Sequence, residues 1–425
     1  MNRTTLLLRR LAAIAVCLAL FPALLIFADD ADDAPPEPKP DPEGVITFEN
    51  LDSRLLTGGL AGRIVMENLG AVSGTDFEQL REYLRLQMND IAQAQWTMIQ
   101  IASLTGQQLG SEYGQLESAA KSLRQQYDDI KDGTAQKDAA DRIRMVENLR
   151  DTVLMGGEAL YIGVSSIAAA RGQLQRQMDA LDRALTGLEL RRALGQISEA
   201  MLEQQYANRA ALASALQTTD AAISTYKMHL EEMVGAPVTG MSVLGPLPEV
   251  TAEQLDAMDL ETDLAAAKEA SYALYAAGLD LEDAKENWKD AQDYKYEGNK
   301  LHYVYVQAEH AWQAAQLTYD NKFQEFERRF QVLYLQVKDD AQIVAAKETA
   351  LETERRNCAI AELKYKLGMI SNQELLSAKD ALDEAQDAVN SAKRTLFSAW
   401  NSYRWAVNRG ILSETDYVSM GGTNT

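Results

Sequence analysis

The stretch Tyr365–Ala378, YKLGMISNQELLSA, carries the signals of a tight turn between two helices. Gly368 can adopt left-handed backbone angles, which is typical of the residue just after a helix. Ser371 is a suitable N-cap for a returning helix, and Glu374 stands three residues later, as in a capping box. The stretch therefore predicts that one helix ends and the next begins within a few residues, forming a helical hairpin.

The predicted helices on both sides of this turn are long. Residues 301–367 contain neither Gly nor Pro, and a continuous helix of that length would extend about 100 Å. After the turn, apolar residues recur at alternating steps of three and four, which is a heptad pattern. Large residues alternate with alanine along this stripe, so a neighbouring helix can approach closely. The stripe consists of Leu375, Ala378, Leu382, Ala385, Val389, Ala392, Leu396, Ala399, Tyr403 and Ala406.

The turn has a second copy 173 residues upstream. Residues 194–202 and 367–375 share five of nine residues, in the pattern L-G-x-I-S-x-x-x-L. Each copy follows a long charged helical run and precedes an amphipathic helix that ends at glycine, as helix C-termini often do. These helices are expected at 199–234 and 372–409, ending at Gly235 and Gly410. The sequence therefore predicts an all-α fold of internally duplicated, long antiparallel helical hairpins, with little or no β-structure.

Prolines divide the chain into the same parts. All nine prolines lie before residue 43 or between residues 237 and 248, and proline is excluded from helix interiors. Two long proline-free blocks therefore correspond to two helical repeats. The expected divisions are a signal peptide at 1–28, an acidic Pro-rich linker at 29–43, a first helical repeat at 44–237, an inter-repeat loop at 238–251, a second helical repeat at 252–410 and a flexible tail at 411–425.

The N-terminus predicts export. Three arginines precede an apolar run over residues 11–27, and an acidic stretch begins at Asp29. A cleaved signal peptide is the preferred interpretation, and an uncleaved anchor is the alternative because the run is nearly long enough to span a bilayer. Cleavage changes the net charge from −22 to −25 and leaves Cys358 as the only cysteine, so no internal disulfide is expected. Such an acidic chain is not expected to bind nucleic acid.

The sequence gives no indication of catalysis. It has no HExxH, GxSxG, GxGxxG or Walker pattern. A lone helical histidine is far more often a surface or packing residue than a ligand, and the three histidines lie on predicted helices. We therefore expect no enzyme activity, no catalytic residue, no cofactor and no metal site. The histidines are His229, His302 and His310.

The second turn and the heptads that run on to Trp400-Asn401-Ser402-Tyr403 resemble the outer membrane efflux protein family, the TolC-like channels. Leu230–Pro237 looks like the end of that family's first repeat, and Val45–Leu51 like its N-terminal lead-in. The resemblance implies a homotrimer whose hairpins form a coiled-coil α-barrel, a passive conduit in a tripartite efflux or secretion system. Its partners would be an adaptor, or membrane fusion, protein and an inner-membrane pump.

The resemblance also implies site residues. In the family the two hairpin tips of each protomer dock the adaptor, which assigns that role to Leu194, Gly195, Ile197, Ser198, Leu367, Gly368, Ile370 and Ser371. Polar contacts near the tips hold the family's closed end shut. Tyr365 and Glu374 occupy matching positions and are the candidate gate, although Met201 replaces the acid expected in the first repeat.

One family feature is not matched. Each family repeat contains a β-hairpin that contributes to a membrane barrel, and a membrane strand needs about 9–11 residues of alternating pattern. The corresponding regions here, near 95–120 and 270–300, contain a polar loop at 105–114 and a predicted helix at 281–292 followed by a polar turn. Our hypothesis is that the barrel is reduced or missing, with helix-helix turns in its place.

Two functions remain open on the sequence. The first is a TolC-like conduit for small molecules or polypeptides, in the outer membrane if the organism has one and otherwise extracytoplasmic or at the cell surface. The second is an exported coiled-coil scaffold or interaction protein of the cell envelope without channel activity. Composition and heptads fit both, and the duplicated tips favour the conduit.

Overall fold

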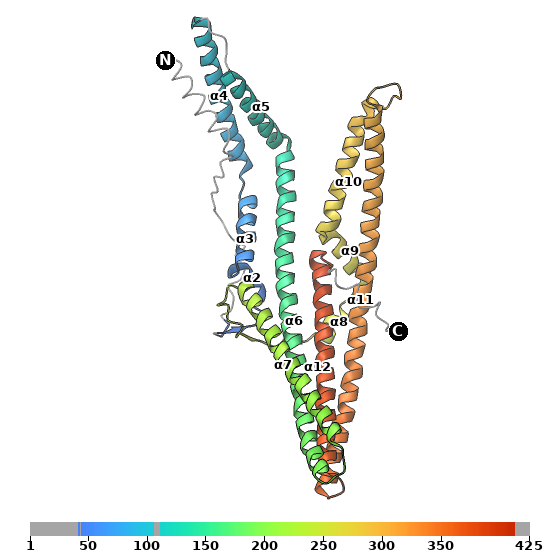
Figure 1. The fold of residues 1–425 in the computed structure, drawn as a ribbon. Coiled ribbons are helices and arrows are strands. Elements are labelled where there is room, and N and C mark those ends of the chain that lie inside the picture. Colours follow the sequence, from blue (N-terminus) through green and yellow to red (C-terminus); the bar gives the residue numbers. More distant parts are fainter. Residues whose placement is uncertain (1–40, 43, 106–110, 413–425) are drawn as a thin grey trace. The chain divides into compact units, whose positions relative to one another are not determined.

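The computed structural model describes residues 41–42, 44–105 and 111–412 (Figure 1). The predicted signal peptide, nearly all of the linker, residues 106–110 of the predicted polar loop and residues 413–425 of the tail lie outside the described residues. The chain forms two compact units, which are considered separately. The first contains Ile64–Leu149, and the second combines the described residues of Pro36–Arg63 and Arg150–Thr425.

The first unit is built around an antiparallel pair of helices, α4 (Phe77–Thr105) and α5 (Ser111–Asp132). Buried residues recur every seven positions along both helices, which is the spacing of a coiled-coil seam. They are Leu84, Ile91 and Met98 in α4 and Leu116, Leu123 and Ile130 in α5. Helix α4 ends at Thr105 and helix α5 begins at Ser111, so the loop predicted at 105–114 is wrong for its first residue and its last four. Helix α3 (Leu60–Ser73) enters this unit, and α6 (Thr134–Ala193) leaves it.

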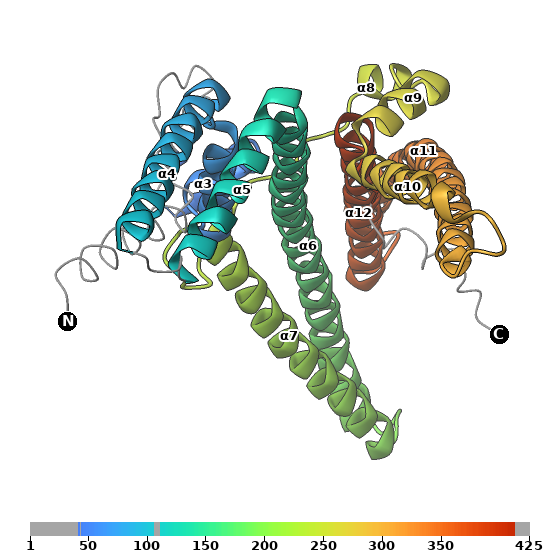
Figure 2. The same cartoon turned by 90° about the horizontal axis from the view of Figure 1, so that it is seen from above.

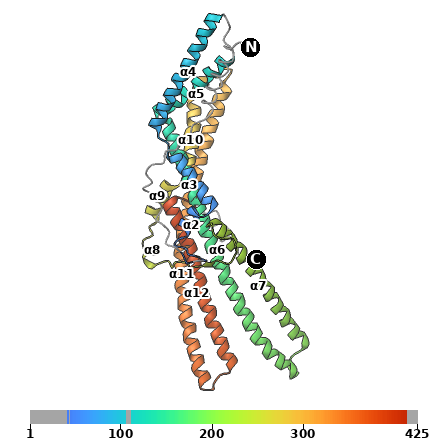
Figure 3. The same cartoon turned by 90° about the vertical axis from the view of Figure 1, so that its left-hand side faces the viewer.

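The second unit contains the two long hairpins, which Figure 3 shows from the side. The first pairs α6 with α7 (Glu199–Met233), and the second pairs α11 (His302–Lys366) with α12 (Asn372–Arg409). The helices predicted on both sides of each L-G-x-I-S turn are confirmed within one or two residues. The remaining elements of this unit are α2 (Leu51–Thr57), α8 (Ala252–Asp256), α9 (Leu260–Ala270), α10 (Tyr272–Asp290) and the short 3-10 helix η1 (Ala291–Tyr294).

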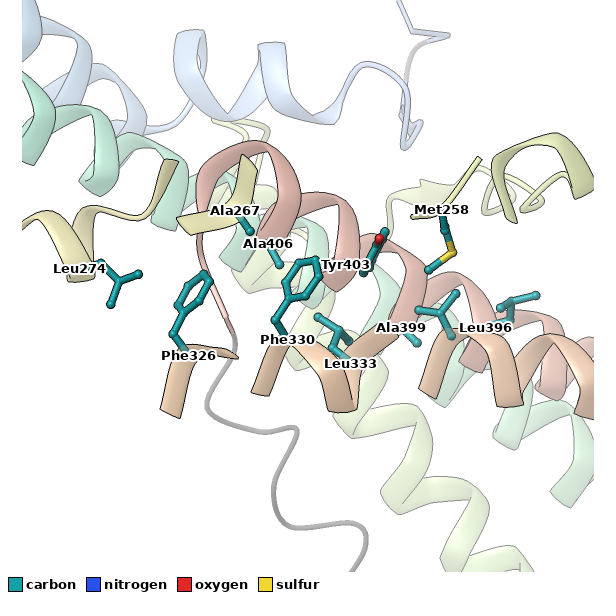
Figure 4. Packing of buried hydrophobic residues seen from close by; sticks show 11 residues of the cluster. Met258, Ala267, Leu274, Phe326, Phe330, Leu333, Leu396, Ala399, Tyr403 and Ala406 are labelled. Atoms are coloured by element: carbon teal, nitrogen blue, oxygen red, sulfur yellow. The ribbon is translucent and has the colours of Figure 1, made fainter. Parts of the chain in front are cut away.

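Helices α11 and α12 approach each other closely, as the leucine–alanine alternation predicted. Phe330 and Leu333 of α11 pack against Ala399 and Tyr403 of α12, and Ala406 is fully buried between α12 and its neighbours (Figure 4). Small side chains at every second stripe position let the backbones come together while the large residues fill the remaining space. The core of the second repeat therefore lies inside its own hairpin and extends to α9.

The described residues contain two strands, each of two residues. Val45–Ile46 (β1) pairs in parallel with Val243–Leu244 (β2), which ties the predicted inter-repeat loop to the N-terminal segment. The buried Tyr161 hydroxyl lies 3.0 Å from the carbonyl oxygen of Ile46 and 2.8 Å from that of Gly245. In the two regions where the resemblance implied β-hairpins, described residues 95–105 and 111–120 and residues 272–294 are helical. The prediction of little β-structure is thus confirmed for the described part of the chain.

An apolar cluster surrounds this strand pair. It combines Leu51 and Leu55 of α2, Leu154 of α6, Leu230 of α7 and Trp405 of α12, so it joins the N-terminal segment to both repeats. Among the described residues, α6 is the one helix whose length and composition would allow it to cross a membrane, a test that buried helices of soluble proteins also pass.

Each returning helix ends in a left-handed glycine that touches another part of the backbone. Gly235 follows α7 with φ +67°, and a Cβ there would overlap the carbonyl of Gly58, between α2 and α3. Gly410 follows α12 with φ +62°, and a Cβ there would overlap Ser271, between α9 and α10. In both repeats the end of the returning helix therefore packs where the entering helical segment is interrupted. We call these two contacts the glycine junctions.

We predict that Gly410→Ala lowers the free energy of unfolding by about 2 kcal/mol or more, because alanine adds left-handed strain and a backbone clash. The control is Gly187→Ala, in the interior of α6, where a Cβ would meet no atom within 4 Å. That change should stabilise the protein by about 1 kcal/mol through helix propensity. Denaturant unfolding followed by circular dichroism measures both, and equal effects would contradict the role of the junction.

Candidate functional site

The two hairpin tips have the same backbone conformation. Gly195 has φ +73° and Gly368 has φ +70°. In the first tip the amide of Gln196 donates to the carbonyl of Arg191 at 2.8 Å, and in the second the amide of Met369 donates to the carbonyl of Lys364 at 2.9 Å. This is the Schellman arrangement, in which a left-handed glycine satisfies the last carbonyls of a helix. The short sequence match therefore corresponds to one repeated structure.

The returning helices begin with the predicted serine caps. Ser198 Oγ accepts a hydrogen bond from the amide of Met201 at 3.3 Å, and Ser371 Oγ accepts one from Glu374 at 3.2 Å. Only the second tip has a full capping box, in which the Glu374 carboxylate accepts from the Ser371 amide at 2.7 Å. That backbone hydrogen bond lowers the pKa of Glu374. The two tips thus share geometry and differ by one carboxylate.

The eight predicted docking residues lie in these two turns, and their apolar members are mostly exposed. Leu194 is 64% exposed and Leu367 is 66% exposed, whereas Ile197 and Ile370 are half-buried. Met369 adds a further exposed apolar side chain beside Leu367. Exposed apolar groups gathered at the end of a long hairpin are typical of an interaction surface. The structure therefore places the predicted residues together within each tip and leaves them accessible.

The candidate gate residues are not joined to each other. Tyr365 lies in the last turn of α11 and is exposed, while the Glu374 carboxylate is engaged by its own helix N-terminus. A tyrosine–glutamate contact of this kind occurs instead in the first hairpin, where the Tyr206 hydroxyl donates to Glu189 at 2.6 Å. The sequence comparison missed this pair because it aligned only the turns, and Tyr206 lies eight residues beyond Ser198.

Long polar side chains bridge α6 and α7, whose shared turn Figure 2 shows from above. Arg209 binds both carboxylate oxygens of Asp182, at 2.6 and 3.2 Å, and Arg171 binds Asp220 at 2.9 Å. The side-chain hydrogen bonds from Arg209 lower the pKa of Asp182. Such exposed pairs contribute little stability one by one. They do span the distance between α6 and α7. In the other hairpin, an alanine-rich seam brings α11 and α12 together.

Two further ion pairs connect the hairpins to each other. Arg183 of α6 binds Asp380 of α12 at 2.6 Å, and Arg176 binds Asp387. From the first pair to the second, the arginine lies seven residues earlier in α6 and the aspartate lies seven residues later in α12. This is the pattern expected for antiparallel helices with a heptad register. These pairs were not predicted, although the matching seven-residue spacing of opposite charges was a signal in the sequence.

The two returning helices differ in how many of their own residues are buried. Helix α7 buries Leu202, Leu230 and Glu231, all at its ends, whereas α12, of similar length, buries ten residues. The middle of α7 is alanine-rich and has few neighbours within the chain. The first hairpin therefore presents a long, weakly covered helical face.

No family model matches the chain, and no curated protein matches it. Solved structures do. VceC, an outer membrane protein of Vibrio cholerae, matches over 85% of this chain and 96% of its own, with a TM-score of 0.51 and 14% sequence identity. The CmeC outer membrane channel of Campylobacter jejuni matches over 69% of each chain, with a TM-score of 0.51 and 12% identity. A membrane protein of Pseudomonas aeruginosa matches over 68% of this chain and 74% of its own, with a TM-score of 0.50 and 11% sequence identity.

These comparisons concern the fold. The chain has the all-α, hairpin-based fold of solved outer membrane channels, and the resemblance to TolC-like channels is confirmed at that level. Among the described residues, no group of three or more His, Cys, Asp or Glu side chains could hold a metal ion.

We predict that Met201→Glu strengthens the first tip, because the new carboxylate can accept from the Ser198 amide and complete a capping box. The opening of the first turn of α7 should become about threefold rarer. Hydrogen–deuterium exchange of peptides covering residues 196–204 measures this change.

The matched variant is Glu374→Met, which converts the second tip to the pattern of the first and should loosen the first turn of α12. Its effect should vanish as the pH falls and the Glu374 carboxylate is protonated in the parent protein. Unchanged exchange in both variants at neutral pH would contradict the role of the box.

Proposed function

We propose that this protein is a TolC-like conduit, the passive channel component of a tripartite efflux or secretion system in the cell envelope. The observation that carries the proposal is the pair of matched hairpins in one chain, in a fold that aligns with 96% of the outer membrane protein VceC. Small molecules or polypeptides would pass through it, and energy would come from an inner-membrane pump. The outer membrane is its expected location where the organism has one.

The proposed assembly is a homotrimer, and the uneven burial of the hairpins supports it. Helix α7 has three fully buried residues, all near its ends, and apolar side chains on the same hairpin, such as Leu190 and Met201, are more than half exposed. A closed ring of copies would cover these faces against neighbouring hairpins. An isolated scaffold hairpin would leave them in water.

The proposed partner at the tips is an adaptor protein with a complementary apolar surface. Leu194, Leu367 and Met369 lie at the ends of two rigid helical hairpins, where a docked protein could cover them without rearranging the core. Tyr365 and Glu374 remain the candidate gate of the closed end. Because they do not pair within the chain, we assign Tyr365 to contacts between copies.

The domain boundaries are part of the same proposal. They place the first repeat at 44–237, the inter-repeat loop at 238–251 and the second repeat at 252–410, after a cleaved signal peptide and a linker. The L-G-x-I-S tips and the glycine junctions, which occur once in each of these repeats, support this division.

The mass of the full exported chain tests the assembly. Light scattering in buffer and in detergent, over a range of concentrations, should give three times the mass of one chain, and electron microscopy of the same sample should show rings with a central opening. A persistent monomer in both media would contradict the conduit and favour the coiled-coil scaffold of the cell envelope.

Site-specific photo-crosslinking tests the tips. We predict that a photoreactive phenylalanine analogue at Leu367 captures an exported adaptor protein in intact cells, because this side chain projects from the tip. The matched control is Leu317 of α11, which is 71% exposed and distant in sequence from the tip. If both positions capture the same proteins, or if Leu367 captures only other copies of this chain, the docking role is wrong.

A further inference from the structure

A buried carboxylate in the first repeat is surrounded by donors from the second. Glu158 of α6 is 1% exposed. Its Oε2 accepts hydrogen bonds from Asn401 Nδ2 at 2.7 Å and from Trp405 Nε1 at 2.5 Å, and its Oε1 accepts from Arg404 at 2.5 Å. Three donors of α12, one of them charged, thus surround the Glu158 carboxyl group.

A second carboxyl group meets Glu158 from α2. The charge of Glu158 acts on the half-buried Asp52 carboxyl group, and Asp52 Oδ1 is shielded from solvent and has no hydrogen-bond partner. Two neighbouring carboxylates repel each other when both are ionised, and the shielding of Glu158 and of Asp52 Oδ1 strengthens this repulsion, so a proton on one of them is favoured. Because the donors are all directed at Glu158 and Asp52 Oδ1 has none, the geometry assigns the proton to Asp52.

Other charged groups around the pair do not neutralise Asp52. Asp151 of α6 is 4% exposed and is paired with Arg150 at 2.9 Å and with Arg409 of α12 at 3.5 Å. Arg404 is already bound to Glu158. Burial, followed by the charge of Glu158, raises the pKa of Asp52 to about 7, and the opposing effect of Arg404 is smaller.

The pair lies where three parts of the chain meet. Leu51 and Leu55 of α2 are fully buried in the cluster that also contains Leu154 of α6 and Trp405 of α12. Gly157, next to Glu158, makes room for the Leu55 side chain, which a Cβ there would overlap. Breaking the Asp52–Glu158 contact would therefore loosen α2 from both repeats.

We propose that Asp52 and Glu158 form a proton-binding site that fastens α2 to α6 and α12 when it is occupied and loosens α2 when the proton leaves. In the open form Asp52 is solvated and ionises near its ordinary pKa of 3.8. Between pH 4 and pH 7 the closed form therefore holds one more proton than the open form. Opening becomes about tenfold easier for each pH unit in this window, and it is constant above it.

Hydrogen–deuterium exchange of the full-length protein at pH 5, 6, 7 and 8, corrected for the intrinsic pH dependence of exchange, measures the opening of Leu51–Thr57. We expect the opening constant to rise about tenfold per pH unit up to about pH 7 and then to level off. Peptides from the α11–α12 tip serve as an internal reference. A pH-independent opening of α2 in the parent protein would overturn the proposal.

The variant Asp52→Asn keeps the shape of the side chain and cannot ionise. We expect it to keep α2 closed at pH 8, with an opening constant at least tenfold below that of the parent protein, and to remove the pH dependence. The matched control Glu49→Gln removes an exposed acid three residues away and should change neither. If Asp52→Asn opens α2 at every pH, or leaves its opening at pH 8 unchanged, the proposal is wrong.

Discussion

The architecture depends on the glycine junctions, in which the glycine that follows each returning helix touches the backbone of another segment. A left-handed glycine ends the helix and leaves no side chain in the way, so Gly235 reaches Gly58 and Gly410 reaches Ser271. Each contact fixes the base of a hairpin whose tip lies more than 30 residues away along the chain. Long hairpins amplify any change at their base, so these two contacts govern where both tips lie.

Above the junctions, the two hairpins are held together by different forces. Alanines bring α11 and α12 close enough to share a continuous apolar core, which includes Phe330 and Leu333. Arginines reach across the wider gap between α6 and α7 to Asp182 and Asp220. The second hairpin is therefore stabilised within its own chain, whereas the first has polar bridges that water and salt weaken. The two repeats thus share the structure of their tips and differ in the interactions that hold their helices together.

Local signals in the sequence were enough to predict the helices and tips, because Gly368, Ser371 and Glu374 lie within a span of seven residues. Contacts between distant residues could not be read in the same way. Glu158 lies more than 240 residues from its donors in α12, and nothing near it in the sequence shows that it is buried. The contact between Tyr206 and Glu189 in the first hairpin was also not predicted, because both residues lie outside the matched turns.

Two carboxyl groups beside the same apolar cluster, the buried Glu231 and the half-buried Asp52, respond to pH in opposite directions. Glu231, at the end of α7, accepts hydrogen bonds from the amides of Thr239, Gly240 and Ser242. Burial raises its pKa, but these bonds outweigh burial and lower it to about 2. The stability it provides is present above pH 4.5 and is lost as the pH falls towards 2, whereas that of Asp52 is present below 3.8 and is lost as the pH rises towards 7. Because the two windows overlap only between pH 3.8 and 4.5, the inter-repeat loop and α2 are both held firmly near pH 4, and on the alkaline side only α2 is loosened.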